Sequence, residues 1–104
     1  MEDCIFCKIA KKEIPAEIVW EDDEAVVFKD IKPKAPVHLL IVPRAHIESV
    51  KDLKDEHRSL AAKLIYVARD VAAEQGLNGY KLTFHVGREG GQIVDHIHLH
   101  LLGG

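Results

Sequence analysis

The chain has 104 residues, of which 47% are hydrophobic and 30% charged, and its formal net charge at pH 7 is −3. This length and composition indicate one globular domain spanning residues 1–104, and the negative charge argues against non-specific nucleic-acid binding. No apolar run approaches the roughly 20 residues of a membrane span, and the N-terminus lacks the apolar core of a signal peptide. We therefore expect a cytoplasmic protein with no membrane partner.

The first half of the chain predicts a short helix followed by three strands. Helical spacing of apolar residues covers residues 3–12, with Asp3 as the candidate N-cap and Pro15 beyond the end. A hairpin with an acidic turn follows, and then a proline-containing loop leads to a strand whose nearly continuous apolar run is typical of a central position. The three strands are predicted at Ala16–Trp20, Ala25–Lys29 and Val37–Val42.

The second half predicts one long helix and two strands. A helical stripe of apolar residues ends near Gly76, a suitable C-terminal stop. This stripe consists of Leu60, Leu64, Val67 and Val71. Tyr80–Val86 is a predicted strand, a glycine-rich loop spans residues 87–92, and the last strand begins at His96. The fold class expected from this order is α+β, an antiparallel five-stranded sheet packed with one long and one short helix.

The last predicted strand alternates histidine with aliphatic residues. Side chains alternate faces along a strand, so His96, His98 and His100 should share one face. Imidazole, with an ordinary pKa of about 6.5, can transfer protons, act as a nucleophile or bind metal near neutral pH. Solvated histidines or an expression tag are the plain alternatives, but interleaved core residues argue against a tag. The residues expected in the core are Ile97, Leu99 and Leu101.

The loop before this strand is suited to binding an anion. Its glycines, Gly87, Gly90 and Gly91, allow backbone N–H groups to approach phosphate oxygens, and Gln92 adds a side-chain donor. A simple hairpin turn is the alternative. The neighbouring histidines favour the anion site.

Two cysteines, Cys4 and Cys7, form a C-x-x-C motif near the N-terminus. A redox pair, two isolated thiols, or half of a four-coordinate zinc site would each use this spacing. For the zinc site, His46 and His96 are the candidate remaining ligands. A separate catalytic zinc is also conceivable on the H-x-H pattern, with His38 as a third ligand.

The segment His96-Ile97-His98-Leu99-His100-Leu101-Leu102 resembles the His-φ-His-φ-His-φ-φ signature of the histidine triad (HIT) superfamily. Earlier segments resemble its nucleotide-binding Hint branch in the same order, so the similarity covers essentially the whole chain. These segments are Cys4-Ile5-Phe6-Cys7-Lys8-Ile9, Glu13-Ile14-Pro15-Ala16, Asp30-Ile31, Pro36-Val37-His38 and Gly90-Gly91-Gln92.

The resemblance implies a homodimer whose two sheets join into one, and a hydrolase that cleaves purine nucleoside phosphoramidates or related nucleotidyl compounds. It implies that His98 is the nucleophile and forms a nucleotidyl-histidine intermediate. His100 and Gln92 would bind phosphate oxygens, His38 would lie beside the nucleophile, and Asp30 would accept the ribose hydroxyls. Further nucleotide-binding positions implied are Ile5, Phe6, Ile9, Phe28, Ile31, His85 and Gly91.

Members of the superfamily that carry zinc use C-x-x-C with two histidines, which implies a structural Zn²⁺ on Cys4, Cys7, His46 and His96. Two positions differ from the usual Hint pattern. Ile93 stands where a small hydroxyl residue is usual, and His85 where Asn is common; relatives also usually carry a C-terminal tail beyond the position of Gly104. Ile93 and the absent tail favour a second hypothesis, a zinc-stabilised nucleotide-binding module with little turnover.

Overall fold

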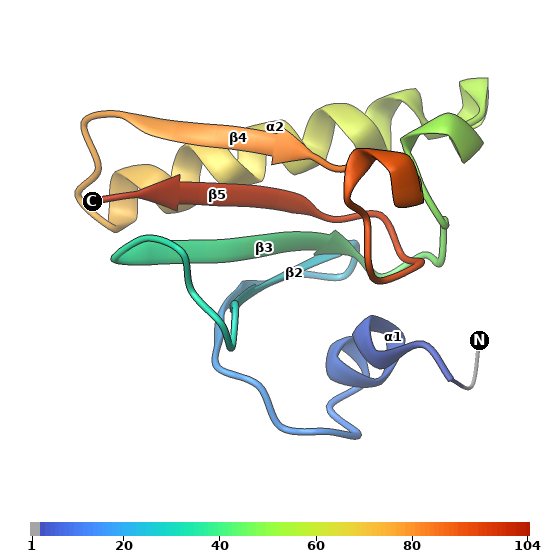
Figure 1. Cartoon of the computed structure of the whole chain (residues 1–104), viewed down its shortest axis with the longest axis horizontal. Helices are drawn as coiled ribbons and strands as arrows, with labels where there is room; N and C mark the ends of the chain where they lie inside the picture. The colour runs from blue at the N-terminus through green and yellow to red at the C-terminus, as the bar shows by residue number, and fades with distance from the viewer. Residues whose placement is uncertain (1–2) are drawn as a thin grey trace.

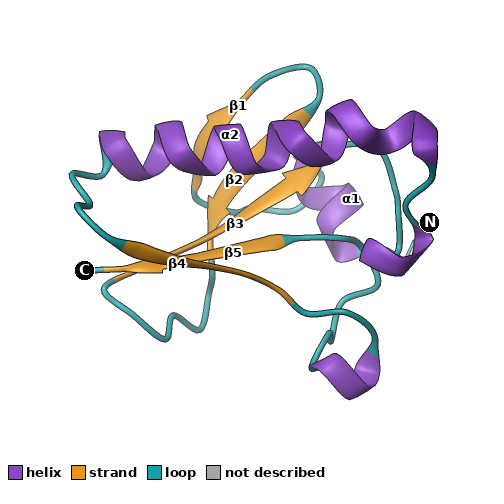
Figure 2. Ribbon diagram, turned by 90° about the horizontal axis from the view of Figure 1, so that it is seen from above, coloured by secondary structure: helices purple, strands orange, loops and turns teal. Residues whose placement is uncertain are grey.

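The computed structural model describes residues 3–104 and confirms the predicted α+β class. Five antiparallel strands form one sheet in the order β1-β2-β3-β5-β4, with the long helix α2 along one side (Figures 1 and 2). The strands are β1 Ile18–Glu21, β2 Ala25–Lys29, β3 Val37–Pro43, β4 Tyr80–Phe84 and β5 Leu99–Gly103. The helices are α1 Ile5–Ala10 and α2 Arg58–Glu74, with 3₁₀ turns η1 Val50–Asp52, η2 Asp55–His57 and η3 Arg88–Gly90.

The main core lies between α2 and the sheet. The apolar stripe of α2 buries Leu64, Val67 and Val71 against strand residues that point to the same side, as its helical spacing predicts. Gly76 follows the helix with a φ of 73°. This left-handed conformation ends the helix, and glycine adopts it without the steric strain that a side chain would cause. Within residues 3–104, no helix combines the length and apolar character needed to cross a bilayer.

A smaller core lies on the opposite face of the sheet, beneath α1. Phe6 and Ile9 of α1 pack against Val26, Phe28 and Leu40 of the two central strands. Leu40 pairs with His100 across β3 and β5, and His100 pairs with Thr83 of β4. Because paired residues share a face, the side chain of His100 projects on the α1 side. His100 therefore belongs to the face of the sheet that α1 only partly covers.

The short helix differs at both ends from the predicted range of residues 3–12. Its N-cap is Cys4 rather than Asp3, because the Cys4 sulfur accepts a hydrogen bond from the backbone N–H of Cys7 at 3.4 Å. The helix stops at Ala10, and Lys12 adopts a φ of 62°, which breaks the helical path well before Pro15.

The histidine strand is shorter than predicted, since β5 begins at Leu99 and not at His96. Leu99 is the last residue of this segment that pairs with both neighbours, with Ile41 of β3 and Phe84 of β4. Beyond it, the backbone N–H of Ile97 bonds instead to the carbonyl of Ile47 in the loop after β3, at 2.7 Å. This change of partner removes His96 and His98 from the ladder.

The other boundaries shift by one or two residues. The first strand starts two residues later than predicted, at Ile18, and a register shift separates Ile18 from Trp20 in its pairing with β2. The third strand runs one residue further, to Pro43, and the fourth ends at Phe84 rather than Val86.

Candidate active site and metal centre

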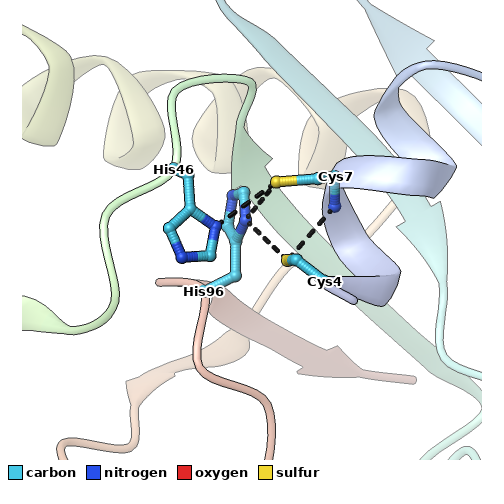
Figure 3. A group of neighbouring side chains, drawn as sticks. All are labelled: Cys4, Cys7, His46 and His96. Carbon is cyan, nitrogen blue, oxygen red and sulfur yellow. Dashed lines mark hydrogen bonds between the residues drawn. The ribbon is translucent and has the colours of Figure 1, made fainter. Parts of the chain in front are cut away.

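Four side chains that lie far apart in the sequence meet at the N-terminus of α1, as Figure 3 shows. Cys4 Sγ lies 3.3 Å from His96 Nδ1. Cys7 Sγ lies 3.3 Å from His46 Nδ1 and 3.5 Å from His96 Nδ1. A tetrahedral zinc, with Zn–S about 2.3 Å and Zn–N about 2.1 Å, separates sulfur from nitrogen by about 3.6 Å. The cluster therefore has the donor set and the spacing to hold a metal ion.

The hydrogen bond made by His96 Nε2 determines that the other ring nitrogen, Nδ1, points at the sulfurs. Nε2 lies 2.8 Å from the carbonyl oxygen of Pro43, and because that oxygen can only accept, Nε2 carries the proton. Nδ1 is left with its lone pair toward Cys4 and Cys7, the orientation that a metal ligand needs. Burial lowers the pKa of His96 to about 4 and raises the pKa of Cys7.

Phe6 separates this cluster from the other histidines. Its ring centroid lies 6.1 Å from that of His96 and 5.0 Å from that of His98, in edge-to-face contact with both. Phe28 supports it from the sheet at 5.3 Å. His96 and His98 therefore serve different clusters although only Ile97 lies between them.

His98 is buried, and its ring is held by the backbone carbonyl of His96. Its Nδ1 lies 2.7 Å from the carbonyl oxygen of His96, so Nδ1 donates and Nε2 keeps a lone pair. Burial lowers the pKa of His98, which keeps the ring neutral at pH 7. The ring lies 4.9 Å from that of His100. A neutral imidazole with a free Nε2 is chemically a nucleophile.

His38 and His100 form a second bonded pair. His38 Nε2 lies 3.0 Å from His100 Nδ1, and the backbone N–H of Lys34 donates to His38 Nδ1 at 3.1 Å. His100 Nε2 is buried and, among the described residues, has no hydrogen-bond partner. Burial, with the neighbouring rings of His98 and His85, lowers the pKa of His100 to about 4.

Asp30 follows β2 and lies at the edge of this group. Its Oδ1 accepts from the backbone N–H of Lys32 at 2.8 Å, and its Oδ2 lies 3.5 Å from His38 Nε2. The carboxylate is partly exposed, so a ligand can still reach it. Asp30, His38 and His100 also offer atoms at metal-binding separations, but the His38 nitrogen nearest the others carries a proton if Lys34 donates to the opposite nitrogen.

Gln92 is buried, and every group of its side-chain amide is bonded to backbone. Nε2 donates to the carbonyl oxygens of Glu48 at 2.6 Å and Val94 at 2.9 Å. Oε1 accepts from the N–H of Gly87 at 2.9 Å. In this structure Gln92 therefore holds the glycine-rich loop against the loop after β3, and its contact with phosphate stays a prediction.

The apolar residues predicted to surround a base fall into two groups. Phe6, Ile9 and Phe28 are buried together in the smaller core. Ile5 and Ile31 are 44% and 89% exposed, so they are free to meet a ligand. A hollow of about 570 Å³ lies beside His46 and η2, away from His98 and His100. The candidate active site is therefore identified by its histidines and not by the size of a cavity.

His85 and Gly91 lie next to the histidine cluster. The rings of His85 and His100 are 4.6 Å apart. Gly91 has a φ of 89°, and a Cβ there would lie 3.7 Å from His85 Nδ1, so the loop passes close to this ring. Both predicted positions therefore adjoin the histidine cluster.

Several groups that support the site could not be identified from the amino-acid pattern. Lys34, Pro43 and Glu48 contribute backbone atoms, which no side-chain pattern reports. Arg88 donates to the Gln92 carbonyl at 2.6 Å and to Asp95 at 2.9 Å, bracing the glycine-rich loop. The opposite charges at spacing i, i+7 across a loop were the only hint of that last pair.

Comparison with known proteins identifies the family. A family model described as "Scavenger mRNA decapping enzyme C-term binding" matches residues 3–104. A purine nucleoside phosphoramidase from Escherichia coli K12 is 46% identical over 105 residues, covering 99% of this chain and 88% of that protein. The crystal structure of a HIT family hydrolase from Legionella pneumophila Philadelphia 1 matches with a TM-score of 0.96 and 50% identity, over 98% of this chain and 93% of that one.

A Zn-bound histidine triad family protein from Mycobacterium smegmatis matches with a TM-score of 0.84 and 28% identity, over 98% of this chain and 75% of that one. The family model and the closely similar relatives span nearly the whole chain, including its three alternating histidines. The chain belongs to the histidine triad superfamily, among the HIT family hydrolases.

Proposed function

We propose that this chain hydrolyses purine nucleoside phosphoramidates, or related nucleotidyl compounds, through a nucleotidyl intermediate on His98. The name of the 46% identical relative from Escherichia coli supports the substrate class. One observation carries the mechanism: His98 donates through Nδ1 to a backbone carbonyl at 2.7 Å and so keeps its Nε2 lone pair free.

The reaction has two displacements at one phosphorus. His98 Nε2 attacks the α-phosphorus, the P–N bond to the leaving amine breaks, and the amine departs with a proton from solvent. Water then attacks the same phosphorus, the bond to His98 breaks, and the nucleoside monophosphate leaves. His100 stands beside His98 to bind the phosphate oxygens in both steps, so one set of donors stabilises both transition states.

The proposed nucleotide lies along the α1 face. Asp30 accepts the ribose hydroxyls through its partly exposed carboxylate, which is the acceptor type that suits a diol. The exposed side chains of Ile5 and Ile31 cover the base, and the backbone of the loop at Gly91 lies toward the phosphate. These assignments extend the family resemblance to this chain residue by residue.

The metal proposed at Cys4, Cys7, His46 and His96 is zinc with a structural role. Two thiolates and two imidazoles would supply the four ligands of a structural zinc, and the Zn-bound relative from Mycobacterium smegmatis supports the choice of metal. Bound there, zinc would tie α1 to the loop after β3, which carries His46, and to the loop before β5, which carries His96. It would supply folding free energy, and every chemical step above uses the histidines on the other side of Phe6.

We also propose a homodimer formed through the edge of the sheet at β4. This strand leaves Tyr80 and Leu82 partly exposed, and α2 exposes Ile65 and Tyr66. An unpaired edge beside apolar side chains is the surface on which two antiparallel sheets join. Light scattering should give twice the chain mass for the parent, and Leu82→Lys should reduce it to the monomer. A monomeric parent would contradict the dimer.

A second candidate function is nucleotide binding with little turnover. Ile93 favours it, because this side chain is 84% exposed beside the glycine-rich loop and offers no hydroxyl to a leaving group. The two candidates differ in one measurement, the production of monophosphate.

The decisive experiment incubates the zinc-loaded protein with adenosine 5′-phosphoramidate. We expect release of adenosine monophosphate and, after rapid acid-free quenching, an acid-labile nucleotidyl adduct that maps to His98. His98→Ala should lower kcat by at least about 10³-fold while changing monophosphate affinity only a few-fold, because the removed group acts in the transition state. Retained turnover in His98→Ala, or an adduct on another residue, would refute the mechanism, and binding without turnover in the parent would favour the second candidate.

A further inference from the structure

We propose that the backbone N–H of Lys34 locks the proton positions of His38 and His100, so that His100 presents a proton-bearing Nε2 to the phosphate. This inference deepens the proposed function by naming a positioning group for the same site. It rests on two consecutive contacts that run from the loop after β2 into the histidine cluster, and on one buried nitrogen without a partner among the described residues.

The first contact fixes His38. A backbone N–H can only donate, and that of Lys34 points at His38 Nδ1 over 3.1 Å. Nδ1 must therefore hold a lone pair, so neutral His38 carries its proton on Nε2. The N–H of Lys34 thus excludes the other neutral tautomer.

The second contact passes this polarity to His100. His38 Nε2 lies 3.0 Å from His100 Nδ1, so the proton on the first atom requires a lone pair on the second. Asp30 Oδ2 also faces His38 Nε2, at the longer distance of 3.5 Å, and its negative charge favours a proton on that nitrogen. Neutral His100 is consequently protonated on Nε2 alone.

The third observation concerns the nitrogen of His100 that faces away from His38. This Nε2 is buried without a hydrogen-bond partner among the described residues, although a buried donor left unpaired costs free energy. An anionic oxygen of the substrate would satisfy it. With the reverse tautomer, a lone pair would face that oxygen and repel it.

The lock also gives neighbouring rings opposite roles. His98 is protonated on Nδ1 by its bond to the His96 carbonyl and is free on Nε2, whereas His100 is free on Nδ1 and protonated on Nε2. Side by side, with ring centroids 4.9 Å apart, one ring offers a lone pair to phosphorus and the other a proton to its oxygen. The Lys34 side chain has no part in this arrangement.

The direct test is the tautomeric state of the ligand-free parent protein. Long-range ¹H–¹⁵N correlation spectra of the zinc-loaded, ¹⁵N-histidine-labelled chain should show His38 and His100 protonated on Nε2, and His98 protonated on Nδ1. A spectrum with the Nδ1-protonated form of His38 or His100 would overturn the proposal. Because no substrate is present, this result stands whether or not the chain proves to be a phosphoramidase.

Two variants at one position isolate the backbone donor. Lys34→Ala keeps the N–H and should leave the spectrum unchanged and kcat/KM within about twofold of the parent, whereas Lys34→Pro removes the N–H. In Lys34→Pro the Nδ1-protonated form of His38 should appear, and kcat/KM should fall about fivefold or more, the size of one hydrogen bond.

The outcomes separate the two proposals. Unchanged tautomers in a folded Lys34→Pro would overturn the role of this amide, and changed tautomers with unchanged kcat/KM would overturn its consequence for catalysis. A correct parent spectrum together with absent turnover would instead refute the proposed function alone. If Lys34→Pro does not fold, the spectrum of the parent still decides the proposal.

Discussion

The two histidine clusters of this molecule draw on the same short segment and are built for different tasks. In the metal cluster, His96 turns Nδ1 toward two sulfurs and uses Nε2 to reach Pro43. In the second cluster, His98 donates through Nδ1 to the backbone carbonyl of His96 and leaves Nε2 free. The first arrangement uses all the binding capacity of the ring, whereas the second leaves a reactive atom available.

The different hydrogen-bond partners of His96 and His98 show that residue type alone does not determine the role of a histidine. The partner of one ring nitrogen determines what the other can do, since a neutral imidazole has one donor and one acceptor. The metal cluster is closed by side chains from three separate segments, and Phe6 keeps it apart from His98. Perturbing one cluster should therefore leave the chemistry of the other intact, which the following experiments test.

The largest effect on stability is expected from the metal cluster. Cys4→Ala removes a proposed zinc ligand and the N-cap of α1, so the free energy of unfolding should fall by at least about 3 kcal/mol. Thermal unfolding and metal analysis measure the loss. At a temperature where the variant is folded, its kcat should stay within a few-fold of the parent.

Chelation of the parent provides the control for Cys4→Ala, because it removes metal without touching the cap. A chelated parent that is fully metal-free and equally stable would contradict the structural zinc. Loss of turnover in the folded, metal-free protein would instead show that the second cluster depends on the metal cluster for its activity.

A smaller effect, confined to the second cluster, is expected from Asp30. Replacing Asp30 with Ala should weaken nucleoside monophosphate binding by about 1.5–3 kcal/mol, the range for a hydrogen bond to a charged group. Calorimetric titration with adenosine monophosphate and its 2′,3′-dideoxy analogue measures the effect. The dideoxy compound should bind parent and variant about equally, and an undiminished preference for ribose in the variant would exclude Asp30 as the ribose acceptor.

The smallest effect is a change in how stability depends on pH. Burial first, and then the neighbouring histidines, lower the pKa of His100 to about 4 in the folded state, against about 6.5 when unfolded. Between these values the unfolded chain binds the extra proton, so stability rises with pH; the contribution is complete above about pH 6.5 and is lost as pH falls toward 4.

Urea unfolding of the parent and His100→Asn at about pH 7, 6 and 5 tests this dependence. The variant should show a shallower rise of stability with pH, by up to about one proton. The metal cluster is common to both proteins, so the difference between the two slopes isolates His100. Identical slopes would show that His100 is not protonated less readily in the folded chain.

Local patterns were sufficient to predict most of the fold. The apolar stripe ending in Gly76 specified α2, a nearly continuous apolar run specified β3, and the alternation of histidine with aliphatic residues indicated the last strand, because each signal depends on the order of residues within one segment. The C-x-x-C motif predicted a metal site with His46 and His96 as the remaining candidate ligands, and the family resemblance pointed to the same two histidines. The structure brings all four candidate ligands together.

The sequence could not specify where the pairing of neighbouring strands ends, or which backbone atoms form hydrogen bonds with the side chains. The histidine period extends from His96, yet β5 begins at Leu99, because its neighbours stop pairing there and Ile47 takes over as backbone partner of Ile97. Likewise, the donors and acceptors on each imidazole come from Pro43, Lys34 and the backbone of His96. Composition and spacing thus indicated that histidines would gather near one end of a sheet, whereas only the tertiary contacts of each ring decided which histidine faces two cysteines, which keeps a free Nε2 lone pair and which has a buried Nε2 without a partner among the described residues.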